Sequence, residues 1–238
     1  MRCIRGIALL ACLALLAALR MPLSAGAQAQ VVYRYAARDG RPRIALTFDD
    51  GPHPAYTPQI LDILKEFDVS ATFFAVGENV EYYPELAARI EREGHEIGNH
   101  TFHHSRIAKM DKNTLKEEIL ACKRAVMEAC GKSPRLFRPP EGVCSETLKA
   151  VCEELDMTIV LWSVDTRDWA HTPECEIVEN VRCNTHNGSI ILMHDFIGKK
   201  SPTPRVLRII IPMLRELGYE FVTVSQLLEA GRSVGGAP

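Results

Sequence analysis

The sequence lacks a large excess of charge of either sign, with 28 basic and 30 acidic residues among its 238 and a net charge of −2. A general nucleic-acid binder usually carries a clear positive surplus, so we expect no nucleic-acid partner. Residues 30–238 also contain no low-complexity tract, repeat or linker-like stretch that would divide them. We therefore predict a single domain over residues 30–231, followed by a flexible tail over residues 232–238.

The sequence also lacks an apolar run long enough to span a membrane. The longest run, from Ile7 to Leu19, has 13 residues, whereas a spanning helix needs roughly 20. It follows Arg2 and Arg5 and precedes a stretch rich in small residues that ends at Ala29. This order is typical of a secretory signal peptide. We interpret residues 1–29 as a cleaved signal, which predicts a secreted or cell-envelope protein with no stable membrane span after cleavage.

Six cysteines follow this segment, in three pairs whose members are eight residues apart. They are Cys122, Cys130, Cys144, Cys152, Cys175 and Cys183. Export favours disulfides, but positions i and i+8 of one helix lie roughly 12 Å apart, which is too far for a bridge. The sequence leaves two interpretations, bridges between different helices or free thiols.

Short β-like segments alternate with longer amphipathic stretches along residues 30–231. The β-like segments are 43–48, 71–76, 96–98, 136–137, 158–163, 189–193 and 220–223. Stretches with apolar residues at helical spacing are 56–67, 84–93, 114–130, 145–155, 173–187, 204–217 and 225–230. This alternation predicts an α/β fold in which helices flank parallel strands. Seven strands favour a distorted (β/α) barrel, closed or nearly closed, in a single domain.

Polar and titratable residues gather directly after the predicted strands. They are Asp49 and Asp50 after the first strand, His100 to His104 after the third, Arg138 to Glu141 after the fourth, Asp165 to Trp169 after the fifth, and His194 and Asp195 after the sixth. In barrels of this type the chemistry lies at the carboxyl ends of the strands. We therefore expect these side chains to converge on one rim.

Two residue pairs within this group suggest metal chemistry. His100 and His104 are four apart and on a helical turn would share one face, which suits two nitrogen ligands of a divalent metal. Asp49 and Asp50 are adjacent, so on an extended strand they point to different sides and can take different roles. The competing interpretations are a pair of surface histidines and a simple Asp-Asp-Gly-Pro turn.

Five motifs together resemble those of one enzyme family. They are Thr47-Phe48-Asp49-Asp50-Gly51-Pro52, His100-Thr101-x-x-His104, Arg138-Pro139-Pro140, Asp165-x-x-Asp168-Trp169 and Leu192-Met193-His194. In this order they resemble the motifs of the polysaccharide deacetylases, the NodB-homology group or carbohydrate esterase family four. The resemblance implies a distorted (β/α) barrel and metal-dependent removal of N- or O-acetyl groups from sugars.

The resemblance also implies a role for each motif residue. Asp50, His100 and His104 would bind one divalent metal, zinc in most of the family. Asp49 would be the general base that activates water, and Arg138 would hold it in place. His194 would be the general acid, oriented by Asp168. The substrate would contact Trp169, Leu192, Pro140 and Glu141.

The resemblance leaves the substrate open. Family members often have tyrosine at the position of Glu141, whose backbone N–H would stabilise the oxyanion. A non-tyrosine residue here resembles the muramic-acid deacetylases, whereas Asp50 resembles the glucosamine-type enzymes. We expect a monomer that deacetylates cell-wall amino sugars, with peptidoglycan as the substrate. The alternatives are a chitooligosaccharide N-deacetylase, an acetylxylan O-acetyl esterase and an inactive glycan-binding module.

Overall fold

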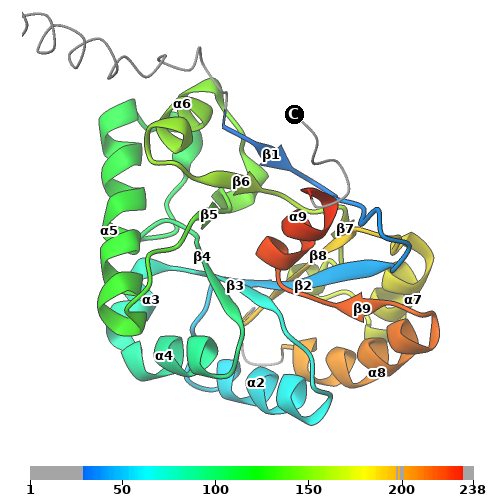
Figure 1. The fold of residues 1–238 in the computed structure, drawn as a ribbon. Coiled ribbons are helices and arrows are strands. Elements are labelled where there is room, and N and C mark those ends of the chain that lie inside the picture. The colour runs from blue at the N-terminus through cyan, green and yellow to red at the C-terminus, as the bar shows by residue number, and fades with distance from the viewer. Residues whose placement is uncertain (1–28, 197, 199–200, 233–238) are drawn as a thin grey trace, which may run out of the picture.

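The computed structural model describes residues 29–196, 198 and 201–232. Its strands are β1 (Val31–Val32), β2 (Arg43–Asp49), β3 (Thr72–Ala75), β4 (Glu96–Asn99), β5 (Leu136–Phe137), β6 (Thr158–Val160), β7 (Val164–Asp165), β8 (Ile190–His194) and β9 (Glu220–Phe221). They form one parallel sheet in the order β1-β6-β5-β4-β3-β2-β8-β7, with β9 also paired to β2. Figure 1 shows this sheet curled into a half-barrel with helices around it.

Eight α-helices and three short 3₁₀ turns connect the strands in the described part of the chain. The helices are α2 (Thr57–Glu66), α3 (Gly77–Tyr82), α4 (Pro84–Arg92), α5 (Lys112–Cys130), α6 (Glu146–Glu154), α7 (Glu174–Asn184), α8 (Thr203–Glu216) and α9 (Val224–Arg232). The turns are η1 (Ile107–Lys109), η2 (Pro140–Gly142) and η3 (Asp168–Ala170). Helix α5 has local signals at both ends, because the Asp111 side chain accepts from two backbone N–H groups and Gly131 ends it with φ 71°.

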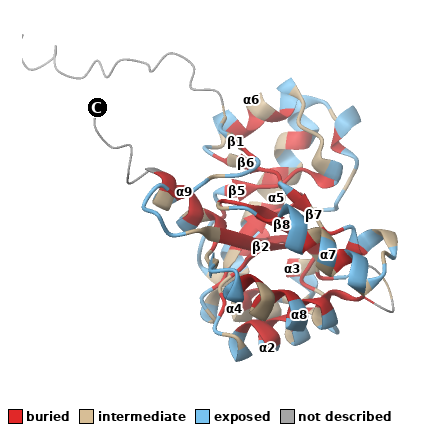
Figure 2. Ribbon diagram, turned by 90° about the vertical axis from the view of Figure 1, so that its right-hand side faces the viewer, coloured by how far each residue is buried: buried red, intermediate tan, exposed pale blue. Residues whose placement is uncertain are grey.

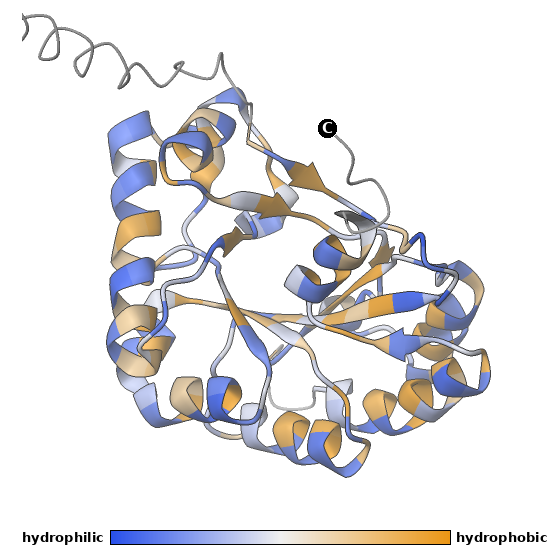
Figure 3. Ribbon diagram, viewed as in Figure 1, coloured by the Kyte–Doolittle hydropathy of each residue, from blue (hydrophilic) through white to orange (hydrophobic). Residues whose placement is uncertain are grey.

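The alternation of side chains along β2 separates two apolar layers. Ile44, Leu46 and Phe48 pack outward against the flanking helices. Ala45 points inward, into a smaller cluster that α9 completes with Val224 and two leucines. Helix α9 thus fills the amino-terminal end of the barrel, and Figure 2 shows the buried strands beneath helices with exposed outer faces. In Figure 3 the same helices have an apolar inner side and a polar outer side. The carboxyl ends of the strands are left for the site.

The single-domain (β/α) architecture confirms the prediction, with a different strand count. The predicted segments all contain observed strands, but β1 and β7 are additional, so the sheet has nine strands rather than seven. Strands β1 and β7 stand at the two ends of the sheet order, so the barrel is open between them. Each has two residues, and β5 and β9 are as short, so alternation alone does not locate strands of this length.

Residues 1–28 of the predicted signal peptide and most of the predicted tail lie outside the described residues. Among the helices that the structure does describe, none is long and apolar enough to cross a bilayer. All six cysteines after residue 29 are free, which favours the thiol interpretation over bridges between helices. Burial raises the pKa of the Cys122 thiol to about 12, so this group stays protonated.

Candidate active site

Most of the residues predicted from the strand ends line one cavity of about 590 Å³. Its walls are formed by Asp49, Asp50, His100, His104, Pro139, Glu141, Trp162, Asp165, Trp169, Leu192 and His194. These residues come from five separate segments between residues 49 and 194. The side chains from these segments therefore converge on one rim of the sheet, as expected.

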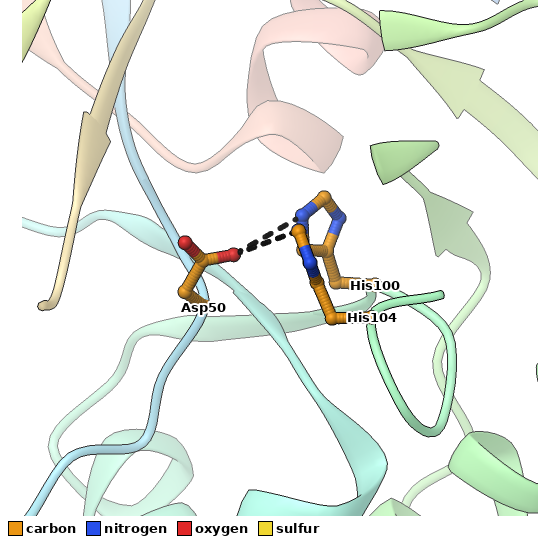
Figure 4. A group of neighbouring side chains, drawn as sticks. All are labelled: Asp50, His100 and His104. Atoms are coloured by element: carbon orange, nitrogen blue, oxygen red, sulfur yellow. Dashed lines mark ion pairs between the residues drawn. The ribbon is translucent and has the colours of Figure 1, made fainter. Parts of the chain in front are cut away.

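Asp50, His100 and His104 form the group suited to a metal. One ligand atom from each of these residues lies within 4.8 Å of the other two. Asp50 Oδ1 is 3.5 Å from His100 Nε2 and 3.2 Å from His104 Nε2, and Figure 4 shows both imidazoles turned toward this carboxylate. His100 Nδ1 donates to the Arg138 carbonyl oxygen at 2.7 Å. Because Nδ1 is the donor in this bond, Nε2 is the His100 nitrogen left to bind a metal.

The two histidines lie in a loop after β4, not on a helical turn as the spacing suggested. Thr101 and His104 both have a positive φ, 67° and 54°, which is incompatible with a helix. Asn99 supports the bend, because its Oδ1 accepts from the Thr101 N–H at 2.9 Å and its Nδ2 donates to the Ile119 carbonyl. The bend, and not helical periodicity, brings both imidazoles to one side.

Asp50 reaches the histidines through an unusual backbone conformation. With φ 73°, it does not continue the extended strand that the sequence argument assumed. Its carbonyl oxygen accepts from Asn79 Nδ2 at 2.7 Å, and the next carbonyl, of Gly51, accepts from the Val76 N–H at 2.9 Å. These bonds hold the strained residue so that its carboxylate faces the cavity.

Asp49 and Arg138 form a buried ion pair beside this group. Asp49 ends β2 on the inward side, two positions after Thr47, and Arg138 Nη1 donates to both at 2.7 Å. The guanidinium also donates to two carbonyls of the β6 segment and lies 4.0 Å from the centre of the Phe74 ring. Arg138 is fully buried, and its fixed fork holds the Asp49 carboxylate in one orientation.

His194 and Asp168 form a second pair across the cavity. Asp168 is fully buried, and His194 Nδ1 donates to its Oδ1 at 2.7 Å while the His194 backbone N–H donates to its Oδ2 at 2.8 Å. Thr203 and the Trp169 N–H complete the coordination of the carboxylate. Burial alone would lower the pKa of His194, but Asp168 outweighs it and raises this pKa to about 9.

Burial and neighbouring charges also shift the pKa values of Asp50 and His104. Burial would raise the pKa of Asp50, but the adjacent His100 and the charges of His194 and His104 lower it to about 2. The Asp50 side chain is therefore a carboxylate at neutral pH. Burial lowers the pKa of His104, which favours the neutral imidazole that a metal requires.

The four residues predicted to contact substrate occupy different places. Trp169 is half exposed, and Leu192 is buried at the cavity wall. Glu141 lines the cavity with φ 58° and an exposed carboxylate 3.5 Å from Arg106 Nε. Pro140 is buried within η2, and the proline in the cavity wall is its neighbour Pro139.

Comparison with known proteins assigns the family. The polysaccharide deacetylase model matches residues 36–160. The chain belongs to the polysaccharide deacetylase family. It is 43% identical over 187 residues to a peptidoglycan-N-acetylglucosamine deacetylase of Bacillus cereus, covering 78% of this chain and 87% of the relative. It is 36% identical to a chitooligosaccharide deacetylase of a Bradyrhizobium strain, covering 79% and 91%.

A solved member of the family has the same architecture. The crystal structure of a peptidoglycan N-acetylglucosamine deacetylase superposes with a TM-score of 0.79 at 38% identity, covering 83% of this chain and 92% of that one. The fold and the deacetylase class inferred from the five motifs are thereby confirmed. Members of this family are metal-dependent hydrolases of acetylated glycans, and the chain carries a matching Asp–His–His group.

The donor set of this deacetylase fits a divalent metal on the geometry of its own side chains. Asp50 Oδ1 is buried and has no hydrogen-bond partner, although the carboxylate is charged. Two imidazole nitrogens lie on the same side of it. A buried anionic oxygen beside two imidazole nitrogens is the set that zinc and similar ions take.

The strand-end motifs did not identify Trp162, and they assigned no role to Asp195, which was expected only as part of the rim. Trp162 lines the cavity, and its ring centre lies 5.8 Å from the Arg138 guanidinium. Asp195 is fully buried directly after His194, and burial raises the pKa of its carboxyl to about 7. Like the other site residues, Trp162 comes soon after a strand, in this case β6. This position in the sequence is the signal from which Trp162 could have been predicted. The burial of Asp195 depends on a distant helix and had no local signal.

Proposed function

We propose that this deacetylase is an exported, zinc-dependent enzyme that removes the N-acetyl group from N-acetylglucosamine in peptidoglycan. The observation that carries the proposal is the placement of three groups around one cavity. These are the ligand set at Asp50, the Asp49–Arg138 pair and the His194–Asp168 pair. The similarity to peptidoglycan deacetylases supports the choice of substrate.

Asp50, His100 and His104 would hold the ion. When bound, zinc supplies Lewis-acid chemistry, because it polarises the acetyl carbonyl and lowers the pKa of a coordinated water. The firmest of the three ligands is His100, which is buried and fixed through its Nδ1. The identity of the metal rests on this donor set, since two imidazoles and one carboxylate suit zinc.

Asp49 takes the role of general base. Arg138 occupies its Oδ1, while Oδ2 lies 3.7 Å from His100 Nε2 at the edge of the ligand group. The Oδ2 atom is therefore positioned to accept a proton from water as the oxygen attacks the acetyl carbon. The bound guanidinium keeps the carboxylate from rotating away.

His194 takes the role of general acid. Its Nδ1 is bonded to Asp168, so the Nε2–H is the proton available to the cavity. A pKa of about 9 keeps this proton in place at neutral pH. Its transfer to the amide nitrogen lets the carbon–nitrogen bond break, which releases acetate and a free sugar amine.

The cavity wall bears on the choice of substrate. Trp169 offers an exposed ring for a sugar face, and Leu192 offers an apolar wall for the acetyl methyl group. A chitooligosaccharide deacetylase among the relatives supports a second candidate, with the same reaction on a soluble glycan. Both substrates carry N-acetylglucosamine, so the same pocket residues suit both.

The test is acetate release by the zinc-loaded protein from peptidoglycan fragments, chitooligosaccharides and acetylxylan, with mass spectrometry to locate the modified sugar. We expect turnover of peptidoglycan with new amines on glucosamine residues. Amines on muramic acid alone, or preference for acetylxylan, would overturn the proposed substrate. The variant Asp50→Ala should lose both zinc and activity, whereas Asp62→Ala, which removes an exposed carboxylate on α2, should keep both.

Export is tested separately. The basic start, the 13-residue apolar run and the small residues after it support a cleaved signal. Expression in a bacterial host should yield a mature protein in the medium or cell envelope, with a new amino terminus after Ala27 or Ala29. Recovery of the full-length chain from the cytoplasm would contradict export without touching the deacetylase chemistry.

A further inference from the structure

Asp195 is a buried carboxylate that the reaction does not use directly. It is fully buried and absent from the cavity wall. Its Oδ2 accepts a hydrogen bond from Thr57 Oγ1, while its Oδ1 is buried without a partner. Its backbone N–H donates to the Asp49 carbonyl at 3.0 Å. A buried carboxylate is costly, so its presence between two catalytic segments calls for a role.

Thr57 connects this carboxylate to a rigid helix. It is the first residue of α2, which packs into the core through Ile60, Leu61 and Leu64. While its hydroxyl donates to Asp195, the same oxygen accepts from the His53 N–H at 2.7 Å. The Thr57 hydroxyl therefore joins the turn after Asp50 to the end of β8.

Gly51 shows how closely the carboxylate packs on that turn. A β-carbon at Gly51 would lie 2.1 Å from Asp195 Oδ2, so only glycine fits. On its other side the turn is held by Val76 and Asn79, which donate to the Gly51 and Asp50 carbonyls. The turn is thus clamped between β3–α3 and the Asp195–Thr57 pair.

We propose that Asp195 is a positioning residue which, with Thr57, fixes the metal ligand Asp50 relative to the proton donor His194. Asp195 is one peptide away from His194 and packs on the residue after Asp50, so one side chain sets both positions. The inference rests on the proposed metal-dependent reaction. A displacement of about 1 Å in such a site can cost about 100-fold in rate, which makes the effect measurable.

The test compares Thr57→Val, Thr57→Ser and Asp195→Ala with the unaltered protein. Zinc affinity is measured by chelator competition, ligand geometry by the visible spectrum of the cobalt-loaded protein, and kcat and KM by acetate release. Outer-shell partners of metal ligands typically contribute about 10–100-fold. We expect Thr57→Val and Asp195→Ala to weaken zinc binding and lower kcat by about that factor, with an altered cobalt spectrum. KM should stay within about twofold, because the sugar contacts are untouched, and Thr57→Ser should restore all three readouts.

A matched control separates positioning from stability. Ser225 Oγ donates to Glu96, a second hydroxyl–carboxylate pair, which is partly buried where α9 meets the start of β4. Ser225→Ala should lower Tm by a similar amount and leave zinc affinity, the cobalt spectrum and kcat unchanged. Unchanged zinc affinity and spectrum in folded Thr57→Val would overturn the proposal, and this isosteric variant decides alone if Asp195→Ala does not fold. If the unaltered protein binds zinc but releases no acetate, the proposed function fails, while the zinc and cobalt readouts still decide the role of Asp195.

Discussion

Asp168 sets the charge state of His194, the proposed proton donor. The pKa of His194 lies near 9, since the Asp168 carboxylate outweighs the effect of burial, and the ordinary histidine value is about 6.5. The charged pair therefore stabilises the fold fully below about pH 6.5, and this contribution is lost as the pH rises through about 9. Catalysis by the protonated form should fail over the same upper range.

Replacement of Asp168 by asparagine should move that upper limit. The amide can keep a hydrogen bond to His194 but removes the negative charge, so the pKa of His194 should fall. We expect the alkaline limb of the kcat–pH profile to shift by about 1–2 pH units toward neutrality, with a lower maximum. A profile whose alkaline limb coincides with that of the unaltered enzyme would assign the limb to another group.

Arg138 supplies a prediction about stability. Its pKa is lowered by burial, and its charge is balanced by Asp49 at 2.7 Å. Removal of one partner of a buried pair typically costs about 3–5 kcal/mol. Arg138→Met should lower the free energy of urea unfolding by that amount. The double variant with Asp49→Asn should lose less, since no unpaired charge is left buried, and an equal loss would show that lost packing dominates.

The sequence predicted the identity of the site residues better than their local geometry. The predicted residues line one cavity or lie directly behind its wall, because the order of the strands in the sheet determines where each segment ends. Their catalytic roles stay predictions. The sequence could not show the positive φ of Asp50, nor the burial of Asp195. The partner of Asp195 is Thr57, 138 residues earlier in the chain, and no local pattern encodes such a contact.

At the scale of single elements, the entry to β4 contains a pH-sensitive contact. His95 is buried, accepts from the Ala71 N–H at 3.2 Å and packs edge-on against Phe73. Burial lowers the pKa of His95 to about 4, so the neutral ring belongs to the folded state.

This contact predicts loss of stability in mild acid. A lowered folded-state pKa means that the contribution of His95 is full above about pH 6.5 and is lost as the pH falls toward 4. The difference corresponds to about 3 kcal/mol. We expect His95→Gln to flatten the pH dependence of the urea midpoint between pH 4 and 7. Equal slopes for both proteins would exclude His95 as the titrating group.

Helical periodicity located the longer helices to within a few residues. Helix α3 was not predicted, because its six residues make fewer than two turns and show no repeated apolar spacing. For His100 and His104 the error is the opposite one. Their spacing of four predicted a helical turn, but the chain forms a bend there. Short elements depend on tertiary contacts, such as those from Asn99 and Asn79.

At the scale of the whole molecule, the fold holds without a covalent cross-link between the described cysteines. A reducing agent should therefore leave Tm unchanged within about 1 °C. A thiol reagent should modify the exposed Cys175 and Cys183 in the native protein and reach the buried Cys122 and Cys152 after unfolding. A large fall in Tm on reduction would instead show that disulfide bridges link different helices.

The edges of the open barrel have a consequence for solubility. Strands β1 and β7, at the two ends of the sheet order, have two residues each. An edge that short presents few unpaired N–H and C=O groups to a neighbouring molecule, so it is a poor template for strand addition. The seven-residue β2 is enclosed between other strands. Self-association of this protein into fibrils would therefore have to begin with partial unfolding that exposes the central strands.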